Sequence, residues 1–172
     1  MTQNPFPPSP PKLPQTPPQT PSMALHDEPG HLIRRAQQIA VSRFHEVHGR
    51  HVTPIQYAIL RTLDEAPGID QVTLAQRIAL DTSTTADIAA RLEAKGWIVR
   101  EVLPRRQRRL LLTPAGEAVL QTLRPGAEVM YQGLMSSLAP AEQAEFMRLL
   151  RKFVHLHDQQ QAATPRKPRD PA

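Results

Sequence analysis

The chain has 172 residues and a formal net charge of +5, and this length allows one domain with a buried hydrophobic core. It contains no cysteine, which excludes disulfides, thiolate nucleophiles and cysteine-ligated metal sites. No apolar run approaches the roughly 18 residues of a membrane span, and the first residues lack the order of a signal peptide, so we expect a cytoplasmic protein.

Proline-rich and basic segments flank the central part of the sequence. Nine of the 19 prolines lie within residues 1–21, a composition typical of a disordered or polyproline-like arm. We expect this arm to cover residues 1–26 and a basic disordered tail to cover residues 161–172. The arm is expected to be either a plain solubilising tail or a ligand for a polyproline-binding domain.

Positive charge is concentrated in one central segment. Residues 95–113 hold six lysines and arginines with Glu101 as the one acid. The net charge of this segment is therefore +5, as large as that of the entire chain. Because the arm and the tail are also basic, the remainder of the folded part is net acidic. Charge focused in this way predicts a polyanionic partner, whereas evenly spread charge mainly favours solubility.

The first predicted elements are two helices. Residues 31–49 place apolar side chains at spacings of three and four, which predicts an amphipathic helix that stops at Gly49. Thr53 and Gln56 then form a capping box with Pro54 in the first helical position, so a second helix is expected up to about Glu65.

The middle of the chain predicts a helix-turn-helix followed by a wing. Thr73 and Gln76 form a second capping box, which predicts a short helix over residues 73–79, and a further helix is expected over 83–95. Two β-favouring runs, from Trp97 to Val102 and from Leu110 to Leu112, flank an arginine cluster and predict a β-hairpin.

Long helices are expected after the hairpin. A helical stretch begins at Thr113 and Pro114, is bent or broken at Pro125-Gly126, and is followed by a last helix from about Pro140. These helices and the first one carry more apolar surface than one small module covers, so they suit a dimer interface. The fold class expected is therefore mainly α with a small β-hairpin: a winged helix-turn-helix with N- and C-terminal dimerisation helices.

The predicted helix-turn-helix and hairpin are the candidate site for double-stranded DNA. Hydroxyl side chains at the start of a reader helix can contact phosphates and base edges, and arginines on a wing suit the minor groove. The alternatives are that the hydroxyls only cap the helix and that the hairpin is merely solvated. The candidate DNA-binding residues are Thr73, Gln76, Ser83, Thr84, Thr85, Arg91, Arg105, Arg106, Arg108 and Arg109.

Residues 73–117 resemble the DNA-binding lobe of the MarR family of bacterial transcription regulators. The residues that carry the likeness are RLEAKGWIVR at 91–100 and the motif R-x-x-x-x-x-LTPAGE at 106–117. With the flanking helices, the likeness covers about 31–158. The resemblance implies a homodimer with intertwined terminal helices that binds pseudo-palindromic operators and releases them when a small phenolic or aromatic acid binds.

The predicted organisation follows from this likeness. We expect one MarR-type domain over residues 27–160, with a reader lobe at about 53–113 and dimerisation helices at about 31–48 and 114–158. Two residues depart from the family pattern. Pro104 stands where the family usually has an aspartate, and Asp87 stands where it often has a basic residue, so Asp87 is left out of the candidate DNA-binding set.

The first helix also carries a candidate ligand site. Its polar residues form a stripe beside the apolar face, and an arginine with histidines can hold a carboxylate and a ring hydroxyl. HLIRRAQQIAVSRFHE resembles the first helix of family members that sense aromatic carboxylates, notably nicotinate-pathway repressors, which implies a nicotinate- or hydroxybenzoate-like ligand. The candidate residues are His31, Arg34, Arg35, Gln38, Ser42, His51 and Tyr57; the alternative is a solvated surface.

Other functional classes have weaker support in the sequence. His45 and His48 have one-turn spacing, but no cysteine or acidic residue completes a zinc site, so no metal and no cofactor is expected. The sequence lacks a phosphate-binding loop or a nucleophile elbow, which argues against an enzyme. A helical protein-interaction adaptor and a metal-responsive regulator of the same fold are the remaining alternatives.

Overall fold

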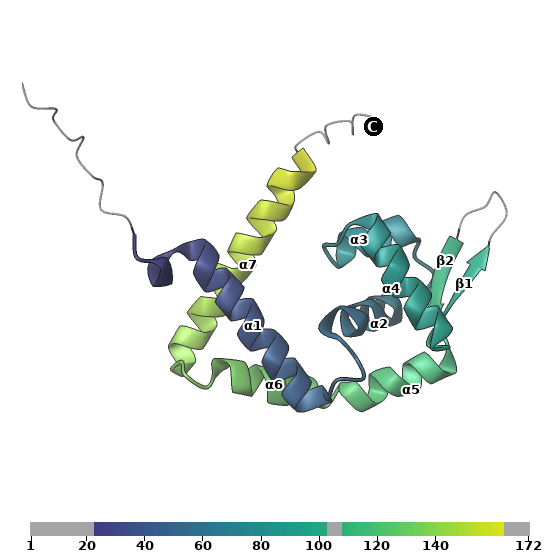
Figure 1. Ribbon diagram of the computed structural model, residues 1–172, viewed down its shortest axis with the longest axis horizontal. Coiled ribbons are helices and arrows are strands. Elements are labelled where there is room, and N and C mark those ends of the chain that lie inside the picture. The colour runs from purple at the N-terminus through teal and green to yellow at the C-terminus, as the bar shows by residue number, and fades with distance from the viewer. Residues whose placement is uncertain (1–22, 103–107, 164–172) are drawn as a thin grey trace, which may run out of the picture. The chain divides into compact units, whose positions relative to one another are not determined.

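The computed structural model describes residues 23–102 and 108–163. Within these ranges the chain is mostly helical with one two-stranded antiparallel sheet, as predicted (Figure 1). By their contacts the residues form two units, one ending at Gln37 and one beginning at Gln38. The elements are η1 (Leu25–Asp27), α1 (Pro29–His48), α2 (Pro54–Glu65), α3 (Gln71–Arg77), α4 (Thr82–Ala94), β1 (Ile98–Val102), β2 (Arg108–Leu112), α5 (Pro114–Leu123), α6 (Gly126–Met135) and α7 (Pro140–Ala163).

The helix starts confirm one predicted capping box and correct the other. The Thr53 side chain accepts from Gln56 N, and the Gln56 side chain accepts from Thr53 N, both at 3.2 Å, so α2 begins as predicted. The box predicted at Thr73 is wrong. Asp70 caps α3 instead, accepting from the backbone N–H groups of Val72 (2.9 Å) and Thr73 (3.0 Å), because a carboxylate three residues upstream satisfies the free donors first.

The hairpin is anchored along both edges of β2. On one side β2 pairs with β1 in a register that sets Arg100 opposite Leu110 and Glu101 opposite Arg109. On the other side Gly68 N donates to Leu110 O and Leu110 N donates to Ile69 O, both at 3.0 Å. No sequence signal predicted this pairing of the segment after α2, so it is a finding of the structure.

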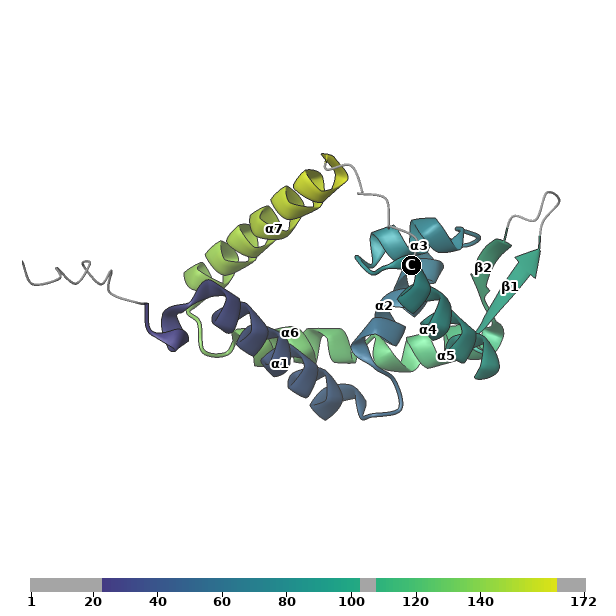
Figure 2. The same ribbon diagram turned by 45° about the horizontal axis from the view of Figure 1, so that its top comes forward.

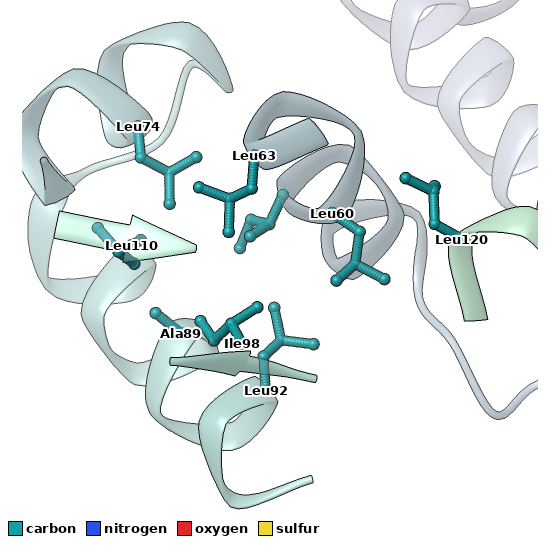
Figure 3. Close-up of a cluster of buried hydrophobic side chains, with 9 residues drawn as sticks. Leu60, Leu63, Leu74, Ala89, Leu92, Ile98, Leu110 and Leu120 are labelled. Atoms are coloured by element: carbon teal, nitrogen blue, oxygen red, sulfur yellow. The ribbon is translucent and has the colours of Figure 1, made fainter. Parts of the chain in front are cut away.

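One hydrophobic core holds the helix-turn-helix and the hairpin together. Buried side chains from α2, α3, α4 and both strands point toward one another, with Leu120 of α5 against the α2 side (Figure 3). Burying one large apolar side chain of this kind stabilises the folded state by about 1.5–3 kcal/mol. The members of this cluster are Ile59, Leu60, Leu63, Leu74, Ala89, Leu92, Ile98, Leu110 and Leu120.

The predicted break between the two helices after the hairpin is confirmed. Helix α5 ends at Leu123 and α6 begins at Gly126. A Cβ on Gly126 would lie 2.3 Å from His48 Cε1 and 2.7 Å from Val47 Cγ1, so a larger residue where α6 begins would displace the buried His48 ring at the end of α1. None of the helices in the described ranges has the length and apolarity that a membrane crossing requires.

The terminal predictions differ from the structure by a few residues. Leu25–Asp27 form a single 3-10 turn where the sequence predicts the end of the disordered arm. Helix α7 continues to Ala163, past the expected end at about residue 158. The proline-rich residues before Met23 and the basic tail after Ala163 lie outside the described residues.

Candidate nucleic-acid interface

A tight turn sets the angle between α3 and α4. Ala79 has a φ of +53°, a left-handed conformation that side chains disfavour, and Leu80 N donates to Ala75 O (3.0 Å) to close the end of α3. The Gln71 side chain donates to Thr82 O (3.3 Å), which ties the first residue of α3 to the first of α4. Both views show α3, α4 and the hairpin grouped around α2 (Figure 2).

The exposed face of α4 contains three of the residues predicted to contact DNA. Ser83, Thr84 and Arg91 are exposed, and Asp87 lies between Thr84 and Arg91 on the same face at helical spacing. The predicted contact from Thr85 is wrong, because its side chain is fully buried and its hydroxyl donates to Asp81 O (2.8 Å). The reader surface of α4 is therefore one residue smaller than the sequence indicated.

Asp81 binds the two exposed hydroxyls at the start of α4. Its Oδ1 accepts from Ser83 Oγ (2.5 Å) and from Thr84 N (2.8 Å), and its Oδ2 accepts from Thr84 Oγ1 (2.6 Å). These bonds, above all the one from Ser83, lower the pKa of Asp81 far below its ordinary value. The cap of α4 is therefore Asp81 and not the hydroxyls of Ser83 and Thr84, so the capping alternative given for them is wrong.

Asp70 makes the same arrangement at the start of α3. Thr73 Oγ1 donates to Asp70 Oδ2 (2.6 Å), and this bond is the largest cause that lowers the pKa of Asp70. Thr73 is half-buried, whereas Gln76 and Arg77 are exposed at the end of the helix. Arg77 was missed by the sequence reasoning, although a basic residue in the last turn of the first helix of a helix-turn-helix is a usable signal for phosphate contact.

The described wing residues form ion pairs that brace the hairpin. Glu101 Oε2 accepts from Arg109 Nε (2.6 Å) and Arg109 Nη2 (2.5 Å), so this candidate DNA-binding arginine is held across the sheet. Arg100 of β1 pairs with Glu93 of α4, which links the strand to the reader helix. Arg105, Arg106 and Pro104, and the side chain of Arg108, lie outside the described residues.

The threonine and glycine of the LTPAGE motif pack against the turn that joins α4 to β1. Thr113 Oγ1 donates to Gly96 O (2.6 Å) and accepts from Gly116 N (3.1 Å), so the residue that caps α5 also holds this turn. A Cβ on Gly116 would lie 1.9 Å from Trp97 O, so only glycine permits the contact. The motif thereby fixes the base of the wing relative to the reader helix.

Three predicted ligand residues lie in the unit that ends at Gln37. His31 is half-buried, and its ring stacks edge-on with His26 at a centroid distance of 5.4 Å. Arg34 Nη2 lies 3.5 Å from His31 Nδ1. Arg34 and Arg35 are both exposed, so their guanidinium groups can meet a carboxylate.

The unit that begins at Gln38 contains the other four predicted ligand residues. Tyr57 is half-buried and packs with Phe44 and His48 at centroid distances of 5.8 and 5.9 Å. Burial lowers the pKa of His48, and nearby His51 lowers this pKa further, so His48 is neutral at neutral pH. The sequence reasoning noted His48 only as a metal candidate; its spacing of four from Phe44 was the signal that it joins this aromatic cluster.

The other polar residues of this unit have local partners. Gln38 and Ser42 are exposed, and Ser42 Oγ donates to Glu46 Oε1 (3.3 Å). His51 is exposed and its carbonyl oxygen accepts from Lys95 Nζ (3.2 Å). His45 Nδ1 lies 3.0 Å from Gly49 O, and within the described part of the chain no three His, Asp or Glu side chains are grouped as metal ligands.

Known proteins resemble this chain in sequence and in structure. The family model described as MarR family matches residues 52–109. The transcriptional regulator HosA of Escherichia coli is 33% identical over 136 residues, which cover 77% of this chain and 99% of HosA.

Two solved structures share the fold. PcaV of Streptomyces coelicolor, a transcriptional regulator solved with its natural ligand, is 34% identical with a TM-score of 0.73, covering 79% of this chain and 98% of PcaV. BpsR of Bordetella bronchiseptica, whose DNA binding is regulated by 6-hydroxynicotinic acid, is 29% identical with a TM-score of 0.73, covering 78% of this chain and 98% of BpsR. The likeness to HosA over nearly its full length, together with the winged helix-turn-helix, shows that this chain belongs to the MarR family of transcriptional regulators.

Proposed function

We propose that this regulator is a homodimeric repressor that binds a pseudo-palindromic DNA operator and releases it when a small aromatic carboxylate binds. The observation that carries the proposal is the exposed face of α4, which lies beside the arginine-rich hairpin. The core beneath this face is shared between α4 and both strands, so the reader helix packs against the base of the wing. The regulation of BpsR's DNA binding by 6-hydroxynicotinic acid supports the same assignment.

The charge of this surface suits DNA. The segment from Lys95 to Thr113 holds six basic residues, and Arg91 on the exposed face of α4 and Arg77 at the end of α3 add to them. Arginine is permanently charged and donates in a planar fork, which suits both phosphates and guanine edges. The proposed contacts are Thr73, Gln76, Ser83, Thr84, Arg91, Arg105, Arg106, Arg108 and, if it leaves Glu101, Arg109.

A dimer is proposed because α7 carries a large apolar stripe. Five apolar side chains at helical spacing on this helix are 42–48% exposed. Pairing two copies would remove this area from water and would set two reader helices against two half-sites of the operator, about one helical turn of DNA apart. The stripe consists of Phe146, Leu149, Leu150, Phe153 and Val154.

A gel-shift experiment over a salt series tests DNA binding. The probe is the DNA upstream of the gene that encodes this chain, with a scrambled duplex of equal length for comparison. We expect saturation at one dimer per site and a steep loss of affinity with salt, because each neutralised phosphate releases counterions. Equal binding to both duplexes, or binding that salt does not weaken, would contradict the proposal.

Arg91→Ala locates the contact on the reader helix. We expect this variant to weaken operator binding by about tenfold or more, since a good base contact contributes about 1–3 kcal/mol of discrimination. Arg151→Ala removes the same charge from the polar face of α7 and is the control. If both variants bind alike, α4 does not enter the groove in the proposed way.

Release by an aromatic carboxylate is proposed from the two arginines of α1 and from the likeness to PcaV and BpsR. A ligand can lower operator affinity only by its preference for a dimer geometry with the wrong spacing of the reader helices. The residues proposed to contribute to ligand binding, each to be tested singly, are His31, Arg34, Arg35, Gln38, Ser42, His51 and Tyr57.

Thermal stabilisation by a panel of aromatic acids identifies the ligand class. Nicotinate, 6-hydroxynicotinate, 4-hydroxybenzoate and benzene as an uncharged comparison are added to the full chain, and a true ligand raises Tm by mass action. We expect Arg35→Ala to abolish the rise in Tm and the release of DNA while leaving operator binding intact. Arg50→Ala, an exposed arginine outside the candidate set, should respond as the unaltered chain does.

A further inference from the structure

The start of the reader helix presents hydrogen-bond acceptors. A hydroxyl has one proton, and the protons of Ser83 and Thr84 are both donated to Asp81 (2.5 and 2.6 Å). What these two side chains offer outward is therefore oxygen lone pairs. Asp81 itself already accepts bonds on both of its oxygens, so its charge is spread over its own helix start.

Asp87 extends this acceptor surface by one helical turn. It is exposed and lies three residues after Thr84 and four before Arg91, on the face proposed to enter the groove. Among the described residues, none forms a hydrogen bond or an ion pair with its carboxylate. Asp87 thus differs from Asp81, which is saturated by its own helix.

In the major groove, a carboxylate distinguishes bases that present a hydrogen-bond donor from bases that present only acceptors. Cytosine N4 and adenine N6 are the amino donors there, whereas guanine N7 and O6 and thymine O4 are acceptors that repel it. Adenine also places its N7 acceptor beside N6, so the second carboxylate oxygen meets a lone pair. Cytosine has only a C–H beside N4, and it is therefore the base that a carboxylate fits best.

We propose that Asp87 is a specificity-determining residue that accepts a hydrogen bond from the N4 amino group of one cytosine in each operator half-site. The proposal rests on the proposed binding of α4 in the major groove. With the lone pairs of Ser83 and Thr84 ahead of it and Arg91 behind it, α4 reads donor-bearing bases first and the acceptor edge of guanine second.

Selection from randomised duplex DNA tests this reading. Full-length wild type is used to enrich binding sequences, and each base pair of the enriched site is then changed singly in competition assays. We expect one C·G pair in each half-site whose replacement weakens wild-type binding by about 5- to 100-fold. Asp87→Ala should lose that preference alone, and Asp87→Asn should shift it toward adenine, whose N6 and N7 an amide can meet together.

Controls separate base reading from charge. Glu117→Gln removes an exposed carboxylate of α5, outside the reader helix, and should leave every base preference unchanged. The salt dependence of Asp87→Ala should match that of wild type, because its slope counts phosphate contacts. If Asp87→Ala binds all sequences more tightly by one common factor, Asp87 only repels DNA and the proposal is overturned. If wild type enriches no sequence at all, the proposed operator binding itself has failed.

Discussion

Gly116 shows how one residue positions the wing. Its Cα lies so close to the α4–β1 turn that a Cβ would be 1.9 Å from Trp97 O and 2.8 Å from Trp97 C, both backbone atoms that cannot rotate away. We expect Gly116→Ala to lower the free energy of unfolding by about 3 kcal/mol, a cost typical of overpacking at a rigid site. Chemical denaturation measures this loss.

A matched glycine provides the control for Gly116. Gly30 in α1 has no atom within 4 Å of the position of a Cβ, so Gly30→Ala should be neutral or slightly stabilising. An unchanged denaturation midpoint for Gly116→Ala would mean that α5 does not begin against this turn.

The start of α4 is held by a carboxylate, and its stability therefore depends on pH. The pKa of Asp81 is depressed in the folded chain, chiefly by the Ser83 hydroxyl, so its contribution is fully present above the ordinary value of 3.8 and is lost as the pH falls through the folded value. We expect Asp81→Ala to lower Tm by several degrees at pH 7, and this difference from wild type to shrink below about pH 4.

Melting curves from neutral to acidic pH measure this effect of the α4 cap. Asp70 is unchanged in both proteins and its depressed pKa affects them equally, so it cancels from the difference. Glu117→Gln removes an exposed carboxylate in the first turn of α5 that accepts no hydrogen bond from the described residues, so its difference from wild type should be much smaller than that of Asp81→Ala at pH 7. A difference between Asp81→Ala and wild type that persists unchanged into acid would show that the carboxylate is not the cap.

The oligomeric state of the molecule depends on what covers the apolar stripe of α7. Leu149 is 48% exposed in the single chain, and in the proposed homodimer it is buried against the partner. We expect Leu149→Glu to reduce the molar mass in light scattering from about twice 19.3 kDa to that of one chain. Operator affinity should fall by about 100-fold, because two linked half-site contacts become two separate ones.

Arg151→Glu tests whether the position on α7 matters. This variant introduces glutamate, as Leu149→Glu does, but at an exposed polar position of α7 outside the stripe, so it should leave the dimer intact. If Leu149→Glu and Arg151→Glu both remain dimeric and bind the operator as wild type does, the stripe on α7 is not the interface.

Local signals in the sequence were enough to predict the fold class, the family, the start of α2, the hairpin and the break between α5 and α6. These depend on local signals: helical and strand periodicity, the capping box at Thr53 and Gln56, and Pro125-Gly126. The exposed reader residues Ser83, Thr84 and Arg91 were also predictable, because helical spacing and polarity specify one face.

Which polar side chains are available for DNA became known from the packing of the folded chain. Thr85 is buried because its position on α4 faces the shared core, and Arg109 is held because the strand register sets it opposite Glu101. The Asp70 cap of α3 is by contrast a local contact, because the carboxylate accepts from backbone donors two and three residues further on, and sequence reasoning missed it. Burial in a shared core and pairing across a sheet depend on distances across the fold, which spacing along one chain does not determine.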